Sequence, residues 1–188
     1  MAGRPRSFDR AAALETAMRE FWGRGYAGVT TAQLASAIGI NQPSLYAAFG
    51  DKATLFAEAS DLYATNLDRS LGEALAARHV RAAMAALLRS AVLNFTREDA
   101  PHGCLIMREP LLAERRRATR EAILRRFEAA VADGEVRNTD EARALADYVN
   151  GVLAGIAARA LDGAKRDELQ RIADLALEAL PRTNVVTP

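Results

Sequence analysis

The amino-acid sequence predicts an all-α protein of about nine helices, because apolar residues recur three or four positions apart along most of the chain. Half of the 188 residues are hydrophobic, and aromatic residues make up only 6%. Alanine and leucine are abundant, and both residues favour helices. The chain is long enough to bury a real core, either as one large domain or as two smaller ones.

The first helix is predicted from Arg10 to about Arg24. Ser7 or Asp9 is a suitable N-cap, because either side chain can accept hydrogen bonds from the first amides of a helix. Gly25 follows the last apolar position and is expected to end the helix. The inner face is predicted to support the helices that follow, through Leu14, Ala17, Met18, Phe21 and Trp22.

The next stretch, Thr30–Lys52, predicts two short helices joined by a tight turn. Thr30 can cap the first of them, and Gln33 three residues later can close a capping box. Gly39 lies where a left-handed residue would end that helix, since glycine has no Cβ to clash there. Ala35, four positions earlier, is a small residue at the place where two crossing helices come close.

A second short helix is predicted after the turn. Asn41 or Gln42 is expected to cap it, and Pro43 fits its first turn, where no backbone donor is needed. Gly50 ends this helix, and Asp51 is expected to cap the next one.

Together these spacings predict a DNA-binding helix-turn-helix. The alternative is an ordinary helical hairpin within a bundle. The apolar side chains that must face each other across the turn are Leu34, Ile38, Ile40 and Leu45.

In a helix-turn-helix the first turn of the second helix points at base edges, so Gln42, Pro43 and Ser44 are the candidate base-reading residues. Gln42 can form paired hydrogen bonds with adenine, and the Pro43 ring can touch a thymine methyl group. Ala47, one turn further on, could add a second methyl contact. Ser44 has an alternative, purely structural role as a helix cap.

Three further side chains are candidates for phosphate contacts. Tyr46 presents a hydroxyl from the second helix, and Thr31 presents one from the first. Lys52 adds a positive charge beside the N-terminal end of its own helix, which is a suitable place for a phosphate. The alternative for Tyr46 is a packed position in the core.

Charge is unevenly distributed around this unit, although the formal net charge of the chain is only +1. No Asp, Glu, Lys or Arg occurs in residues 26–50, so attraction to phosphates must come from the flanks. Lys52 lies on one side, and Arg4, Arg6 and Arg10 lie on the other. Arg4 belongs to a Gly-Arg-Pro segment that resembles minor-groove AT-hook arms, and the alternative for this arm is a solvated, disordered terminus.

A family resemblance covers roughly the first third of the chain. It is carried by Leu45-Tyr46-x-x-Phe49-x-x-Lys52, preceded by Gly39, within GVTTAQLASAIGINQPSLYAAFGDKATLF. This stretch resembles the DNA-binding domain of the tetracycline-repressor (TetR) family of bacterial regulators. The resemblance implies the same DNA-contact roles for Thr31, Gln42, Ser44, Tyr46 and Lys52.

The resemblance also implies an architecture and a function. Residues 1–52 would form the helix-turn-helix DNA-binding domain, and residues 53–180 would form a larger helical domain for ligand binding and dimerisation. The protein would be a homodimeric repressor on a palindromic operator in double-stranded DNA, released by a small, mostly apolar ligand. Ala47 and Ala48 depart from the family, whose members often carry larger or polar residues there, so part of the specificity is expected to come from DNA shape.

After Lys52 the apolar spacing stays helical almost to the end of the chain, and the tail at 181–188 is expected to be disordered. The fourth helix runs to about Ala77 and joins the reading unit to the rest, so it is the natural lever for a signal. The other predicted helices are 79–98, 104–107, 114–133, 139–161 and 165–180.

The last two predicted helices indicate self-association. The eighth carries a stripe of small residues, Gly151, Gly155 and Ala158, beside an apolar stripe. The ninth is apolar on more than one side, with Leu175 and Leu177 outside its main stripe, and such a helix needs two partners. A second copy of the chain, in a twofold four-helix interface, is the simplest second partner. The alternative is that loops or the fourth helix cover the extra face.

Large apolar residues in the fourth to eighth helices could line an internal cavity or form a solid core, and both interpretations stay open at this stage. The TetR resemblance implies a small-molecule pocket in this region. Cys104, the single cysteine, supports a further alternative, in which the regulator responds to oxidation or has no small-molecule effector. The candidate pocket residues are Tyr63, Leu67, Met84, Leu88, Phe95, Met107, Phe127 and Tyr148.

No enzyme active site, metal site or cofactor site is predicted. His79 and His102 are the only histidines, and the His102-x-Cys104 pair is too sparse for zinc. No apolar run reaches the about 18 residues of a membrane helix, and the basic N-terminus lacks the apolar region of a secretory signal, so a cytoplasmic protein is expected. The arginine-rich run at 114–126 is interpreted as a solvated helix face, with a second surface for anions as the alternative.

Overall fold

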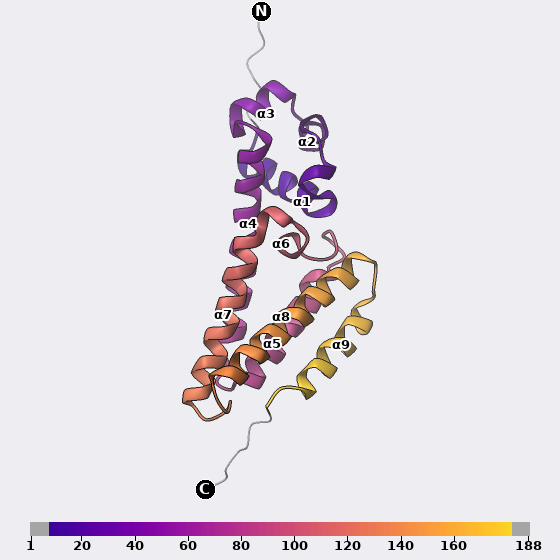
Figure 1. Ribbon diagram of the computed structural model, residues 1–188. Coiled ribbons are helices and arrows are strands. Elements are labelled where there is room, and N and C mark those ends of the chain that lie inside the picture. The colour runs from indigo at the N-terminus through magenta and orange to yellow at the C-terminus, as the bar shows by residue number, and fades with distance from the viewer. Residues whose placement is uncertain (1–7, 182–188) are drawn as a thin grey trace, which may run out of the picture. The chain divides into compact units, whose positions relative to one another are not determined.

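The computed structural model describes residues 8–181, and within that range it is all-helical, as the sequence predicts (Figure 1). These residues form nine α-helices and one short 3-10 turn. The predictions for Arg4, for Arg6 and for the tail beyond Pro181 lie outside the described residues. Contacts divide the chain into two compact units, with the division between Thr65 and Asn66 inside one long helix.

The first unit contains three complete helices and the beginning of a fourth. Asp9 caps the first helix by accepting hydrogen bonds from the amides of Ala11 and Ala12. Gly25 has a φ of 77°, so the helix is interrupted where the sequence predicts its end, and one more turn follows. The helices are α1 (Arg10–Gly28), α2 (Thr31–Ile38), α3 (Gln42–Phe49) and α4 (Lys52–Leu75).

An aromatic cluster joins α1 to the first half of α4. Phe21 meets Phe56 edge to face with ring centroids 5.1 Å apart, and Trp22 meets Tyr63 with centroids 4.9 Å apart. Such pairs add about 0.5–1.5 kcal/mol to the free energy gained by burying the rings. Because these contacts tie the first half of α4 to α1, the division between the units falls later than the predicted boundary at residue 52.

The second unit contains the remaining helices: α5 (Val80–Phe95), α6 (Leu105–Arg108), the 3-10 turn η1 (Pro110–Leu112), α7 (Ala113–Ala132), α8 (Thr139–Leu161) and α9 (Arg166–Glu178). In this bundle α8 is central, because it packs against α5, α6, α7 and α9 (Figure 1). The core between them is filled by fully buried side chains that include Met84, Ile123, Phe127 and Ile156.

Helix bounds differ from the predictions by a few residues at most ends, and α8 agrees at both ends. The fifth helix ends at Phe95 instead of Glu98, because the backbone leaves helical geometry at Thr96, where φ is −121°. The predicted helices do not include η1, a single turn that Pro110 begins just after α6.

Two structural findings concern membrane and metal sites. No helix within residues 8–181 is both long and apolar enough to cross a lipid bilayer. The same residues contain no cluster of three or more His, Cys, Asp or Glu side chains that could hold a metal ion.

Candidate nucleic-acid interface and ligand cavity

Two short helices and a glycine turn build the predicted helix-turn-helix. The Thr30 hydroxyl accepts a hydrogen bond from the Gln33 amide at 3.2 Å, and the Gln33 side chain accepts one from the Thr30 amide at 2.9 Å. This is the predicted capping box at the start of α2. Gly39 ends α2 in the left-handed region, with φ of 81°, and its amide donates to the Ala35 carbonyl.

The N-terminal turn of α3 presents an exposed, uncharged surface. Asn41 is the N-cap, because its Oδ1 accepts a hydrogen bond from the Ser44 amide at 2.8 Å. The Ser44 amide therefore donates to the cap, and the Ser44 side chain is not itself the helix cap. Gln42, Pro43 and, one turn later, Ala47 are exposed, while Ser44 is half-buried. All four predicted base-reading side chains thus lie on the same short helix, α3.

The two predicted hydroxyl contacts to phosphate lie close together. Tyr46 is 46% exposed, so it does not occupy a packed core position. Its hydroxyl donates to Thr31 Oγ1 at 3.3 Å, which joins α3 to the first turn of α2. Each hydroxyl oxygen keeps a lone pair for another donor, and the Tyr46 ring stands at the surface.

The start of α4 combines a cap with a cation. Asp51 accepts a hydrogen bond from the Thr54 amide at 2.7 Å, and this bond, with a second from the Thr54 side chain, lowers the pKa of Asp51 below its usual 3.8. Lys52 places its Nζ 4.4 Å from the centre of the Tyr26 ring. The aromatic ring therefore positions the predicted phosphate-binding ammonium group without neutralising its charge.

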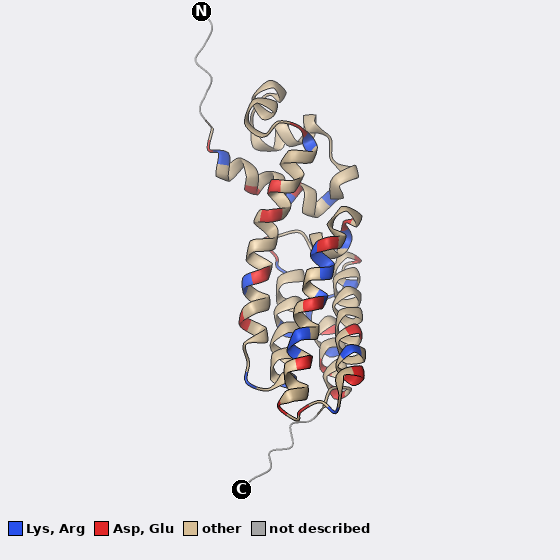
Figure 2. Cartoon of the chain, turned by 60° about the vertical axis from the view of Figure 1, so that its left-hand side comes forward, with Lys and Arg blue, Asp and Glu red and all other residues tan. Residues whose placement is uncertain are grey.

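The charges on and around α2 and α3 agree with the sequence-based expectation except at Arg10. Figure 2 shows neither basic nor acidic residues on α2 and α3, in agreement with the neutral surface that the sequence predicts. Arg10 was expected among the phosphate-attracting flanks, but its guanidinium forms a salt bridge with Glu58 at 2.7 Å. Of the described flanking cations, Lys52 has no acidic partner among the ion pairs of the first unit.

Comparison with known proteins identifies the family. A model of the bacterial regulatory proteins of the tetR family matches residues 13–59. The chain is also 31% identical over 201 residues to the HTH-type transcriptional repressor ComR of Escherichia coli (strain K12), across 95% of this chain and 92% of ComR. The chain belongs to the TetR family.

Two other similar proteins agree with this assignment. The HTH-type transcriptional repressor BdcR of Escherichia coli (strain K12) is 30% identical over 183 residues, across 95% of this chain and 92% of BdcR. A cysteine mutant of the TetR family regulator CifR, solved in complex with 26-bp double-strand operator DNA, has a TM-score of 0.89 and 36% identity, and the match covers 95% of this chain and 100% of that one. This TetR-family protein is thus a helix-turn-helix transcription regulator, as its sequence predicts.

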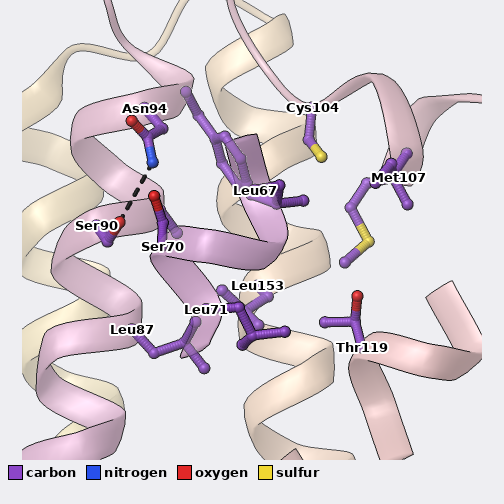
Figure 3. A pocket seen from close by; sticks show the side chains of 13 residues that line it. Leu67, Ser70, Leu71, Leu87, Ser90, Asn94, Cys104, Met107, Thr119 and Leu153 are labelled. Carbon is purple, nitrogen blue, oxygen red and sulfur yellow. Dashed lines mark hydrogen bonds between the residues drawn. The ribbon is translucent and has the colours of Figure 1, made fainter. Parts of the chain in front are cut away.

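The second unit of the TetR-family protein contains a mostly apolar cavity of about 40 Å³ (Figure 3). Its wall comes from the second half of α4, from α5, α7 and α8, and from the segment at α6. The lining residues are Leu67, Ser70, Leu71, Leu87, Ser90, Ala91, Asn94, Phe95, Cys104, Ile106, Met107, Thr119 and Leu153.

The eight predicted pocket residues divide into three groups. The cavity wall includes Leu67, Phe95 and Met107. Tyr63 instead packs on Trp22 in the first unit, and Tyr148 is exposed, so neither lines the cavity. Three others, Met84, Leu88 and Phe127, are fully buried in the solid core. They were predicted as pocket residues because the helical spacing of large apolar residues does not distinguish a cavity wall from a solid core.

The polar groups of the wall are few and uncharged. None of the lining side chains just named is Asp, Glu, Lys, Arg or His. Asn94 donates its amide to Ser90 Oγ at 3.2 Å, as the dashed line in Figure 3 marks. The Thr119 hydroxyl donates to the Arg115 carbonyl at 3.1 Å and so keeps its lone pairs for another donor. The predicted pocket residues did not include Ser90, Asn94 or Thr119, because the prediction was based on large apolar and aromatic residues only.

Apolar surface remains exposed on the last two helices. Gly151 and Gly155 on α8 are exposed, and a Cβ built on either meets nothing within 4 Å. On α9, Leu175 is 72% exposed and Ile172 is 36% exposed. The described residues therefore leave this face uncovered, contrary to the alternative in which loops or the fourth helix cover it.

Proposed function

We propose that this TetR-family protein is a homodimeric repressor that binds a palindromic DNA operator and leaves it when a small, uncharged, mostly apolar molecule enters the second unit. The observation that carries the DNA-binding part is the exposed N-terminal turn of α3, which has no charge of its own and stands beside the hydroxyls of Tyr46 and Thr31. An uncharged surface can approach base edges closely, while hydroxyls and a lysine at its margin hold the phosphates.

In this proposal the residues of α3 divide by task. Gln42, Pro43, Ser44 and Ala47 contact base edges, because three of them are exposed and Ser44 is half-buried in the first turn of the helix. Tyr46, Thr31 and Lys52 contact phosphates, and Arg4 and Arg6 precede the unit as a basic arm. The short side chains of Ala47 and Ala48 leave part of the discrimination to DNA shape.

The dimer is proposed from the uncovered face of α8 and α9. Two reading helices on one palindromic site require a twofold partner, and a twofold interface places the same patch on both subunits. The exposed glycines of α8 allow a close approach of the two α8 helices, and Leu175 supplies exposed apolar surface on α9, which packs against α8.

The ligand class is proposed from the wall of the cavity. A charged ligand would lose its hydration without gaining an ion partner, which costs several kcal/mol. A cavity of about 40 Å³ exceeds the roughly 10–15 Å³ that one water needs, so it suits a ligand of few non-hydrogen atoms or one that opens it further. The Asn94 amide and the Ser90 hydroxyl can bind one polar group of such a ligand.

The DNA-binding proposal can be tested by selecting bound fragments of the host genome with the purified full-length protein. Gln42→Ala should change the preference among fragments, because it removes a base contact. Tyr46→Ala and Lys52→Ala should weaken binding to all fragments alike, and Lys52→Ala should reduce the steepness of log affinity against log salt by about 2, one phosphate contact in each subunit of the dimer. Gln170→Ala, on α9 and outside the helix-turn-helix, is the matched control and should change neither property. A uniform loss with Gln42→Ala would contradict the base-reading role, and failure to recover any fragment would contradict the function itself.

The ligand proposal can be tested by thermal denaturation with matched series of short alcohols, carboxylates and amines. The neutral members should raise the unfolding temperature, and the charged members of equal length should not. Leu71→Phe, which fills the cavity, should abolish the effect, whereas Leu93→Phe at an exposed position of α5 should preserve it. Stabilisation by carboxylates that exceeds that by alcohols would contradict the assignment.

The response to oxidation through Cys104 gains no support from the geometry. Cys104 is only 4% exposed and belongs to the cavity wall, so little of its surface is open to an oxidant in solvent. Release from DNA by oxidants should be the same for Cys104→Ser as for the natural protein.

A further inference from the structure

Arg10, the first residue of α1, contacts both α3 and α4. Its Nη2 donates to both carboxylate oxygens of Glu58, at 2.8 and 2.7 Å. Its Nε donates to the carbonyl of Ala48 at 3.3 Å, and its guanidinium carbon lies 4.5 Å from the centre of the Phe49 ring. One side chain thus joins three helices of the first unit.

The contact with Ala48 falls at a place where α3 needs a partner. The last carbonyls of any α-helix lack acceptor bonds within the helix and carry its negative end. α3 has no basic residue in its last turn, so Arg10 supplies the cation from another helix. With only eight residues, α3 is too short to be stable alone, and its direction depends on such anchors.

Glu58 directs Arg10 toward α3. The carboxylate binds one side of the guanidinium, and this leaves Nε to face the Ala48 carbonyl. At the opposite end of α3, Asn41 caps the helix, and Tyr46, near the middle of α3, bonds to Thr31 on α2. Arg10 is the corresponding anchor at the C-terminal end.

We propose that Arg10, oriented by Glu58, is a positioning residue that sets the direction of the recognition helix α3, and that it is not a phosphate ligand. The inference rests on the proposed DNA-binding function but concerns a residue outside the set of DNA contacts. A helix held at both ends presents its base-reading side chains in one orientation, which raises discrimination between sequences. A helix free at one end would bind DNA with less selectivity.

The first test needs no DNA. Hydrogen exchange is measured on the full-length protein for Arg10→Met, which keeps an aliphatic stem over Phe49 but loses the charge and the donors. Exchange of the amides in the last turn of α3 should accelerate about tenfold, with α8 unchanged. Arg24→Met is the matched control, because Arg24 also lies on α1, is also 51% exposed and pairs only with Glu20 at 3.4 Å. Equal exchange in α3 for Arg10→Met and Arg24→Met would overturn the proposal.

The second test uses a fragment recovered in the genome selection and a copy with one base pair changed in each half-site. Arg10→Met should reduce the ratio of the two affinities about tenfold while the salt slope stays equal to that of Arg24→Met. A salt slope less steep by about 2, one contact in each subunit, with the affinity ratio unchanged, would make Arg10 a phosphate ligand and overturn the proposal. If Arg10→Met merely makes the protein less stable, the fraction of protein able to bind DNA should fall while the ratio of the two affinities stays unchanged. That result would also contradict the positioning role.

The Glu58→Gln variant distinguishes the two roles, because a phosphate ligand and a positioning residue predict different changes in DNA binding. If Arg10 were a phosphate ligand, removing its internal partner would release it and raise affinity above that of Glu20→Gln, which removes an equal charge from the Arg24 pair. If Arg10 positions α3, Glu58→Gln should bind less selectively than Glu20→Gln. Should no fragment bind the natural protein, the proposed function fails, and the exchange measurement still decides the role of Arg10.

Discussion

At the scale of single residues, the loop after α5 shows how closely two backbones can approach. Gly103 has a φ of 80°, and its amide donates to the Phe95 carbonyl at 2.9 Å. A Cβ at this position would lie 3.1 Å from the Ala157 carbonyl oxygen and 3.3 Å from the Leu161 Cβ, both on α8. Glycine is therefore required here for its backbone conformation and for its size.

We expect Gly103→Ala to lower the free energy of unfolding more than Gly134→Ala does. Gly134 has a similar φ of 74° but nothing within 4 Å of a built Cβ, so it reports the backbone strain alone, about 1–2 kcal/mol. The crowding at residue 103 should add about 1–3 kcal/mol. Urea denaturation of both variants gives the difference, and equal losses would show that α8 yields to the added methyl group.

Asp51 makes the stability of the first unit depend on pH. Its pKa is lowered chiefly by the Thr54 amide, so the folded state favours the carboxylate. A lowered pKa contributes stability that is fully present above the unfolded value and is lost as the pH falls through the folded value.

The expected result is that the natural protein loses stability relative to Asp51→Asn as the pH falls through and below 3.8, the usual pKa of this carboxyl group. Asparagine still accepts the Thr54 hydrogen bond but does not titrate, so it is the matched reference. Urea midpoints measured across this range give the comparison. A constant difference between the two proteins would mean that the carboxylate cap contributes nothing that titrates.

At the scale of helices, arginines bind the ends of neighbouring elements. Arg116, on α7, donates to the carbonyls of Ile106 at 2.7 Å and Glu109 at 2.5 Å, and so binds the segment that contains α6 and one wall of the cavity. Comparable bonds to backbone carbonyls at or beyond helix ends are made by Arg81, Arg126 and Arg166.

These contacts explain the arginine-rich run at 114–126 of the sequence. Arg117 pairs with Glu114 at 3.2 Å and Arg120 pairs with Asp147 at 2.7 Å, both at the surface. Arg116 and Arg126 instead bind backbone carbonyls. The run is thus partly the solvated face that the sequence predicts and partly a set of structural anchors, which leaves little free charge for an anion.

Arg116→Met should lower the free energy of unfolding by about 1.5–3 kcal/mol, the usual contribution of hydrogen bonds to a charged group. Arg117→Met, one residue away and with only a surface ion pair, should lower it by less than about 0.5 kcal/mol. Chemical denaturation measures both. If the two variants lose the same amount, the carbonyl contacts of Arg116 do not hold α6 in place.

At the scale of the whole molecule, the proposed dimer depends on the uncovered face of α8 and α9. Leu175 is the most exposed large apolar side chain among the described residues, at 72%. A charge at this position would appear twice in a twofold interface, because both subunits contribute the same patch.

Leu175→Glu should raise the dissociation constant of the dimer about 100-fold, since two carboxylates would be buried without partners. Leu111→Glu, at a position on η1 that is 64% exposed, is the matched control and should leave the dimer intact. Sedimentation velocity at several concentrations measures both. A dimer of unchanged strength in Leu175→Glu would place the interface elsewhere.

Sequence reasoning was most accurate where structure is local. The capping box of Thr30 and Gln33, the left-handed Gly39 and the caps at Asp9, Asn41 and Asp51 are each decided by residues a few positions apart. Such contacts form within one or two helical turns, so residue type and spacing contain the information needed.

Contacts between distant residues could not be read in this way. Arg10 lies 48 residues from Glu58 along the chain, and Arg116 donates to the Ile106 carbonyl, 10 residues earlier. The cavity depends on which apolar faces meet and on how well they fill the space between them, so Leu67 lines it while Leu88 is in the solid core.

By itself, the sequence determined the all-helical class, the helix-turn-helix with its neutral reading surface and the family to which the chain belongs, because short-range spacing and capping specify these features. Only the tertiary structure decided that Arg10 is bound inside the first unit, that the cavity carries polar groups at Ser90, Asn94 and Thr119, and that one face of α8 and α9 stays uncovered. These outcomes depend on the packing of whole helices, in which the partner of each side chain is set by three-dimensional proximity and not by distance along the chain.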